Sequence, residues 1–480
     1  MTDFFILMKN EMVVTFIIFF LLFIKIGKGM KNETLLPVIQ VLLLLNFIFS
    51  FFFNKTGSLF GQTFLTLPVH AFEKSLLALG VYLISMLFSG WLKQTKHLPE
   101  FFILLLSALL GMYLMISSVN LLIFYLSLEL ASIPVAAMVN FDLEKKRSSE
   151  GAMKMILTSA FSSGIFLFGA SLIYGSTGTI SFVEMGSLVT GKPLEILAFL
   201  FMFAAFGFKF SIVPFHLWTA DVYEGGPVPT TAFLSVISKG AIAFVFINFL
   251  YYVFTPLMQT WYPLLMILAV VSMLVGNLFA LRQQNIKRFL AFSSIAQVGF
   301  ILVGIILDPE ALKTPEGVAR ITNAVSSVIF FILVYIFSNL AAFGVASAIA
   351  DKTGKENIDD YKGLYKTNPF LTWIMALALF SLAGIPPTAG FFGKLFLLTA
   401  GGANAQYWFI IIAALNMIIS LYYYLRVVRA MFMDKNDHPV EKINPGPAAK
   451  LALILCAAGI VLTGLLSWIY DHIQSIITMH

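Results

Sequence analysis

The sequence predicts an all-α polytopic membrane protein with about 14 transmembrane helices. Composition is the first indication: 59% of the 480 residues are hydrophobic and only 11% are charged, whereas soluble domains carry roughly 25% charged residues. The second is the recurrence of apolar stretches near the length of about 20 residues that crosses a bilayer as a helix. The third is that short connections join these stretches, which leaves little chain for a soluble domain.

The apolar stretches follow one another along the whole chain. They are residues 4–24, 35–53, 75–92, 101–117, 121–141, 151–174, 194–214, 230–254, 261–281, 289–307, 321–350, 370–400, 407–432 and 451–470. The first stretch contains Lys9 and Glu11, and charges are unusual in a spanning helix. We still expect a mature helix there, because a signal peptide would have a shorter apolar core and a small-residue cleavage site.

Basic residues are divided unequally between the two sets of connecting loops. Loops that follow odd-numbered stretches hold 20 Lys and Arg residues, and the opposite side holds 6. The positive-inside rule therefore places the odd loops in the cytoplasm and both termini outside. The net charge of +6 reflects this asymmetry, so it indicates no nucleic-acid partner.

Two stretches are expected to be broken helices. The seventh holds Pro214 after Lys209, and the twelfth holds Pro386 and Pro387 before Lys394. Proline frees backbone groups at membrane depth, and transporters use such breaks at binding and gating sites. The breaks lie five stretches apart, and an odd offset reverses the direction of the chain across the membrane. Stretches 4–8 and 9–13 are therefore predicted to form two inverted-topology five-helix repeats.

This topology predicts four segments. Residues 1–97 form an N-terminal three-helix segment, and residues 98–254 form the first repeat. Residues 261–433 form the second, inverted repeat, and residues 449–480 form a C-terminal helix.

Apart from the charges of the first stretch and those close to the ends of other stretches, five ionisable residues are predicted at membrane depth: Glu129, Lys154, Lys209, Lys239 and Lys394. Such groups are costly to place in a bilayer, so they indicate a charge pathway through a polar interior. A carboxylate near a buried lysine stabilises its charged form, and we expect Glu129 and Lys209 to pair in this way. Lys154 lies one turn into its stretch, so extension toward the lipid headgroups is an equally good interpretation.

Redox and metal cofactors are not expected in this chain. Its single cysteine, Cys456, lies in an apolar stretch, and no phosphate loop, dinucleotide fingerprint or metal-binding cluster is present in the sequence. The driving force for transport must then come from an ion gradient or a partner. His216 could transfer protons near neutral pH, but a structural hydrogen bond explains a lone histidine equally well.

One long motif resembles a known family. The stretch FKFSIVPFHLWTADVYEGGP at residues 208–227, continuing to Lys239, closely resembles the signature of the antiporter-like subunits of respiratory complex I. Residues 150–164, 285–299 and 382–394 agree with that family. The segment from Asp221 to Gly225, together with a lysine at Lys394, is most similar to its N-type subunits.

The resemblance implies a proton channel built of two half-channels. Matched positions give Glu129 and Lys209 as the input pair, Lys239 as the central relay and Lys394 as the site of the second half-channel. Lys154 and His216 are candidates for a secondary proton path. The chain would then be a non-redox translocase subunit in the inner membrane of a bacterium, among other membrane subunits of complex I. NADH, FMN, iron–sulfur clusters and quinone would belong to its partners.

Two alternatives remain at this stage. A subunit of a multi-subunit cation/proton antiporter resembles the same family, but a glutamate usually stands there in place of Lys394. A membrane-embedded scaffold would not need five ionisable residues at membrane depth, because each one makes insertion less favourable.

Overall fold

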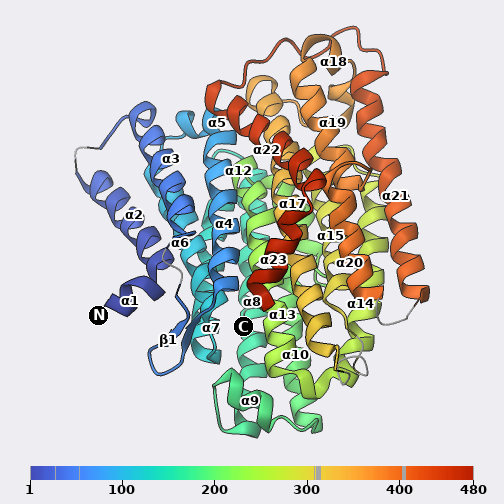
Figure 1. The fold of residues 1–480 in the computed structure, drawn as a ribbon. Coiled ribbons are helices and arrows are strands. Elements are labelled where there is room, and N and C mark those ends of the chain that lie inside the picture. The colour runs from blue at the N-terminus through green and yellow to red at the C-terminus, as the bar shows by residue number, and fades with distance from the viewer. Residues whose placement is uncertain are drawn as a thin grey trace.

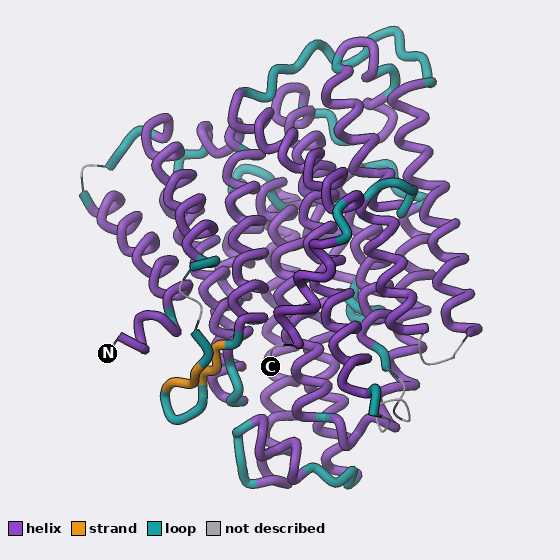
Figure 2. The backbone as a smooth tube through the Cα atoms, viewed as in Figure 1, coloured by secondary structure: helices purple, strands orange, loops and turns teal. Residues whose placement is uncertain are grey.

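The computed structural model is a single bundle of closely packed helices (Figures 1 and 2). It describes residues 2–27, 29–52, 55–307, 309, 315–402 and 407–478. Predictions that involve Met1, Lys28, Phe53, Lys313 and His480 therefore lie outside the described residues. The all-α membrane fold is confirmed, because twelve helices in the described part are long and apolar enough to cross a membrane.

The elements run in the following order. They are α1 (Thr2–Leu7), α2 (Lys9–Ile26), α3 (Asn32–Phe49), β1 (Gly57–Leu59), β2 (Phe64–Thr66), α4 (Pro68–Leu87), α5 (Ser89–Gln94), α6 (Leu98–Ser117), α7 (Leu121–Val139), α8 (Lys146–Thr177), α9 (Phe182–Leu188), α10 (Pro193–Phe210), α11 (Leu217–Gly225), α12 (Val228–Ala232), η1 (Phe233–Ser238), α13 (Lys239–Asn248), η2 (Phe249–Val253), η3 (Thr255–Leu257), α14 (Met258–Ala280), α15 (Ile286–Ile305), α17 (Gly317–Thr353), η4 (Ile358–Tyr361), α18 (Leu364–Thr367), α19 (Pro369–Ala383), α20 (Ala389–Gly402), α21 (Tyr407–Phe432), α22 (Pro447–Leu465) and α23 (Trp468–Thr478).

Helix length and hydropathy neither confirm nor contradict the predicted number of fourteen spanning helices. Helix α2 is absent from the twelve, and it contains Lys9, Glu11 and Lys25. The twelfth predicted stretch is divided into the shorter helices α19 and α20. The count of fourteen, the inverted repeats and the segment boundaries therefore stay predictions.

Two local features differ from the sequence prediction. Strands β1 and β2 form a short antiparallel hairpin in which Gly57 pairs with Thr66. Two helices, α22 and α23, occupy the C-terminal region for which one was expected. The hairpin lies in the half of the bundle that holds the chain termini, whereas α22 begins near α5 in the other half and leads down to α23 (Figure 1).

Both predicted helix breaks are present. Helix α10 ends at Phe210, and α11 resumes at Leu217. Helix α19 ends at Ala383, where Gly384 takes the left-handed conformation (φ 85°) that glycine adopts without steric cost. The two halves of this broken helix meet so closely that a Cβ on Gly390 would lie 1.7 Å from the Ser381 carbonyl oxygen. Only glycine fits there.

The helix that carries Lys239 is also irregular. The segment Phe233–Ser238 (η1) winds as a π-helix and leads directly into Lys239, the first residue of α13. Single π-helical turns are rare and often lie at functional sites. Nearly all residues of this helix and of α15 are buried, as is most of the apolar part of α17, so these three helices form the centre of the bundle.

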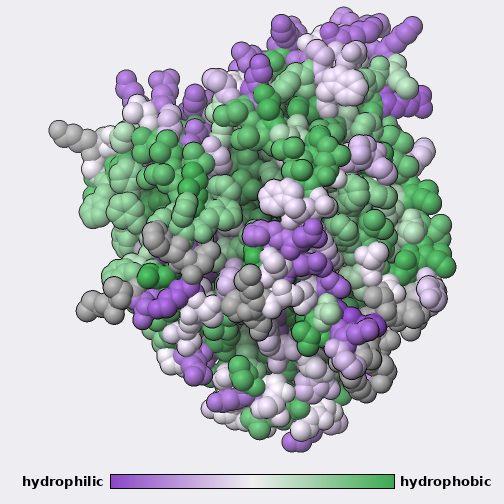
Figure 3. All heavy atoms as spheres, in the orientation of Figure 1, coloured by the Kyte–Doolittle hydropathy of each residue, from purple (hydrophilic) through white to green (hydrophobic). Residues whose placement is uncertain are grey.

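Polar side chains gather at the end of the bundle that carries α5 and α18, and apolar side chains form a belt below them (Figure 3). Both chain termini lie in the opposite half of the bundle (Figure 1). This arrangement agrees with the unequal distribution of basic residues. Which end faces the cytoplasm stays a prediction.

Candidate functional site

A series of polar residues crosses the bundle from α7 and α8 to α20. Its first members, Glu129, Ser159 and Lys209, are half-buried, and Lys239 and Lys394 are buried. At its first end, the Lys209 ammonium donates hydrogen bonds to Ser132 Oγ on α7 and Ser159 Oγ on α8, both at 2.7 Å. Glu129 on α7 accepts a hydrogen bond from Ser163 on α8. Among the described residues no ion pair joins Glu129 to Lys209, so the predicted partners are neighbours that bind separate serines.

A small cavity lies beyond Lys209. It has a volume of about 20 Å³, and its polar lining comes from Ser132, Lys209, Trp218 and Ser238. A cavity of this size holds about one water molecule. Ser238 directly precedes Lys239 in the chain, so the cavity lies between the first lysine of the series and the helix that carries the second.

Lys239 is the next charged group. It is 1% exposed, and its ammonium donates to Ser294 Oγ on α15 at 2.7 Å. One turn earlier, Ser235 accepts a hydrogen bond from Asn339 of α17 at 2.9 Å. Hydroxyl and amide groups, rather than a carboxylate, therefore surround the central lysine.

Helix α15 carries the series on to Lys394. The Gln297 amide donates to the Tyr424 hydroxyl at 3.2 Å and to the Leu382 carbonyl oxygen at 3.0 Å. Lys394 donates to the same carbonyl at 2.7 Å and to that of Ala383 at 3.3 Å. These carbonyls end α19, so the helix has no further N–H groups for them and its negative dipole end points at the ammonium. The break in the twelfth stretch thus creates the Lys394 site.

Lys154 and His216 stand apart from this series. The Lys154 side chain is 41% exposed and pairs with Glu150 at 2.7 Å and Asp221 at 2.6 Å. Asp221 also binds Arg288 at 2.7 Å, which joins α8, α11 and α15 near the surface. His216 is buried between α10 and α11, and its Nδ1 has no hydrogen-bond partner. A secondary proton path through Lys154 and His216 stays a prediction.

Sequence reasoning missed a second buried charge cluster. The third apolar stretch was expected to begin at residue 75, which left Lys74 in the preceding loop, but α4 begins at Pro68 and buries this residue. Lys74 pairs with Glu11 at 2.5 Å and donates to Ser117 at 2.6 Å, and the neighbouring Glu73 is also buried. Buried charges therefore extend beyond the five residues that the sequence indicated. Proline favours the first turn of a helix, so Pro68 was the available signal for the earlier start.

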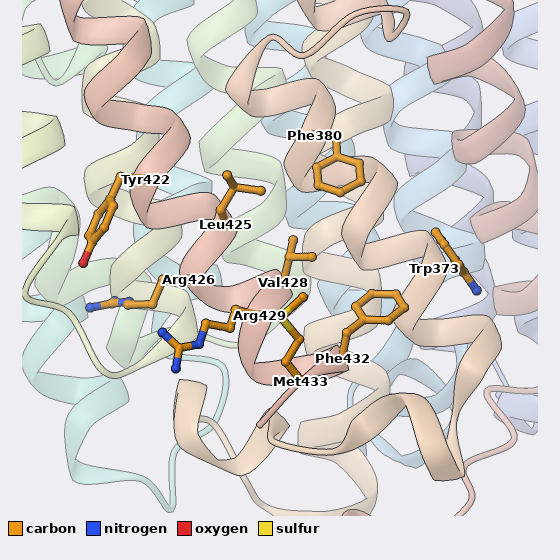
Figure 4. Close-up of a pocket in the computed structure, with 9 residues that line it drawn as sticks. All are labelled: Trp373, Phe380, Tyr422, Leu425, Arg426, Val428, Arg429, Phe432 and Met433. Atoms are coloured by element: carbon orange, nitrogen blue, oxygen red, sulfur yellow. The ribbon is translucent and has the colours of Figure 1, made fainter. Parts of the chain in front are cut away.

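A large groove lies away from the lysine series. It has a volume of about 610 Å³ and is lined by Trp373 and Phe380 of α19 together with residues of α21 (Figure 4). Its lining is apolar except at Arg426 and Arg429, whose guanidinium groups lie close together (Figure 4). No group of three or more His, Cys, Asp or Glu residues in the described part could hold a metal ion. The polar series that contains Lys209, Lys239 and Lys394 is therefore the candidate site.

Comparison with known proteins identifies the family. The family model described as NADH:quinone oxidoreductase/Mrp antiporter, TM, matches residues 118–420, which is more than half of the chain and includes every residue of the lysine series. The chain belongs to this family. Its resemblance to the antiporter-like subunits of complex I is thereby confirmed.

Within the family, the chain is similar to NADH-quinone oxidoreductase subunit N from Phocaeicola vulgatus, with 47% identity over 86% of each chain. It is 45% identical to the subunit N of Azobacteroides pseudotrichonymphae, over 88% of this chain and 87% of the relative. Among solved structures, it is similar to a chain of respiratory complex I from Thermus thermophilus with bound aureothin. That match has a TM-score of 0.79 and 27% identity, and covers 95% of this chain and 97% of the other.

The fold of the family extends to antiporters. The chain matches a chain of the Mrp complex from Dietzia sp. with a TM-score of 0.83 and 18% identity, over 98% of this chain and 96% of the other. Identity this low shows a shared fold only. The similarity to relatives named subunit N, at 45–47% identity, is what separates the complex I branch of the family from the Mrp branch.

Proposed function

We propose that the chain is the N-type, proton-translocating membrane subunit of a bacterial NADH:quinone oxidoreductase. It is a non-redox subunit, and NADH oxidation and quinone reduction take place in its partners. The proposal rests on the relatives named subunit N and on one observation above all. Three lysines lie in series along the bundle, of which Lys239 and Lys394 are buried and Lys209 is half-buried. Each donates to hydroxyl or carbonyl oxygens rather than to a fixed carboxylate.

This arrangement suits proton transfer, because none of the three ammonium groups is held in a permanent ion pair. Lys209 receives a proton at the end near Glu129 and passes it through the small cavity to Lys239. Groups on α15 and the Leu382 carbonyl lie between Lys239 and Lys394. Each proton moved against 100 mV requires about 2.3 kcal/mol, which conformational changes driven by quinone reduction in partner subunits would supply.

The finer assignments belong to the same proposal. The partners are other membrane subunits of the complex, including the sister antiporter-like subunits, and the chain lies in the bacterial inner membrane with both termini on the outer side. The chain itself binds no redox cofactor. A cation/proton antiporter subunit is the less favoured alternative, because the structure of that branch shares the fold at only 18% identity.

Replacing Lys239 by methionine is expected to lower proton translocation by about tenfold or more, since positioned proton carriers typically contribute about 100-fold or more. The measurement is proton uptake by proteoliposomes that contain the whole complex, driven by NADH and quinone. Ferricyanide reduction should stay unchanged, because it reports only on the peripheral redox subunits. The exposed Lys366→Met variant is the matched control, and full pumping by assembled Lys239→Met complex would refute the role of Lys239.

The partners are tested separately. The tagged chain, extracted in mild detergent, is expected to co-purify with flavin- and iron–sulfur-containing subunits that oxidise NADH, as identified by mass spectrometry. Recovery with small membrane antiporter subunits alone would instead assign the chain to stand-alone cation/proton exchange.

A further inference from the structure

The contacts of Lys209 reveal a binding position that the sequence did not predict. Its ammonium lies between two hydroxyls, one from α7 (Ser132) and one from α8 (Ser159), each at 2.7 Å. Ser132 donates its own proton to the Leu128 carbonyl at 2.6 Å, so its oxygen is oriented to accept from the lysine. Two elements thus supply matched acceptors for a single amine.

The same two helices repeat this pattern one turn away. Glu129 lies three residues before Ser132 on α7, and Ser163 lies four residues after Ser159 on α8. Residues at these spacings share one helix face. Ser163 donates a hydrogen bond to Glu129, and this pair is called the carboxylate level. Ser132 and Ser159 form the hydroxyl level, which is also called the serine level. One helical turn, roughly 5 Å, separates the two levels. Lys209 occupies the hydroxyl level.

The hydroxyl level also adjoins the small cavity. Ser132, Lys209 and Ser238 all line that space, whereas Glu129 does not. A lysine bonded to the two serines therefore has access to a water molecule that can reach Ser238, next to Lys239. A lysine drawn to Glu129 would move away from it.

We propose that Ser132 and Ser159 form a second docking position for the Lys209 amine, which holds it away from Glu129 and beside the cavity that leads to Lys239. The inference rests on the proposed proton-translocating function and adds to it. The lysine takes up its proton at the Glu129 level and delivers it from the serine level. The serines are positioning residues, and their hydroxyls set the balance between the two levels.

The test is the Ser132→Ala/Ser159→Ala double variant of the whole complex in proteoliposomes. Each lost hydrogen bond to the charged amine lowers occupancy of the serine level by about tenfold, so the double variant should lower it by about 100-fold, and pumping should fall accordingly. Infrared difference spectra should show a changed carboxylate signal, assigned to Glu129 by its absence in Glu129→Gln, because Lys209 then pairs with Glu129. The single variants Ser159→Ala and Ser159→Thr serve if the double variant does not assemble, and threonine, which keeps a hydroxyl, should restore pumping.

The control is Ser162→Ala. Ser162 neighbours Ser163, but its hydroxyl bonds to the Ala205 carbonyl on α10 instead, so pumping and spectrum should remain those of the parent complex. The proposal is overturned if the serine variants pump normally, or if they lose pumping without a change in the Glu129 signal. The Lys239→Met variant distinguishes failure of this proposal from failure of the proposed function. If Lys239→Met pumps normally, the proposed proton-translocating function itself fails.

Discussion

The Lys394→Met variant is expected to assemble into the complex and to lose at least about tenfold in proton translocation, as for other removed proton carriers. Lys394 is 1% exposed, and the carbonyl oxygens of Leu382 and Ala383 bind its ammonium. Methionine has a similar length but has no N–H group and no exchangeable proton. The measurement is proton uptake by proteoliposomes, normalised to the rate of NADH oxidation.

Two further substitutions separate the proton from the charge. Lys394→Arg retains a positive charge opposite the carbonyls, but arginine does not release its proton in proteins, so the complex should be stable and pump poorly. Lys394→Glu places a carboxylate opposite the carbonyl oxygens of Leu382 and Ala383, which are also acceptors. This variant should reduce proton translocation at least as much as Lys394→Met. Lys450→Arg, at an exposed position on α22, is the control. Normal pumping by Lys394→Arg would show that the charge, rather than proton transfer, is what the site provides.

Lys74→Met is expected to lower the free energy of unfolding by about 3–5 kcal/mol, because it leaves one charge of a buried pair without compensation. Lys74 and Glu11 have side chains that are 1% and 3% exposed, and they join α4 to α2. The measurement is the thermal unfolding of the purified complex, followed by fluorescence, together with the amount of the chain retained in membranes.

The double variant Glu11→Gln/Lys74→Met should recover most of this loss, since it removes both charges of the pair. Lys55→Met is the matched control. Its partner Asp3 and Lys55 itself are exposed, at 65% and 53%, so water already screens the pair and little change is expected. A Lys74→Met complex as stable as the parent would contradict a stabilising role for the buried pair.

Much of the fold followed from the sequence. Breaks near Pro214 and Pro386 were predicted and are present, because proline removes a helical hydrogen bond and clashes with the preceding turn. The start of α4 was placed seven residues too late, because Glu73 and Lys74 made its first two turns look like a loop. The π-helical turn before Lys239 had no signal in composition or periodicity, since it depends on how α12 and α13 pack against their neighbours.

The sequence by itself determined that the chain is a membrane protein and where two of its helices break, because apolar length and proline act locally. Only the tertiary structure decided what each lysine binds. Lys209 meets Ser132 from 77 residues away, and Lys74 meets Glu11 from 63 residues away. These contacts depend on which helix faces pack together and on how far each helix is shifted along its axis relative to its neighbour. For that reason Glu129 and Lys209, expected as a pair, lie one helical turn apart on separate serines.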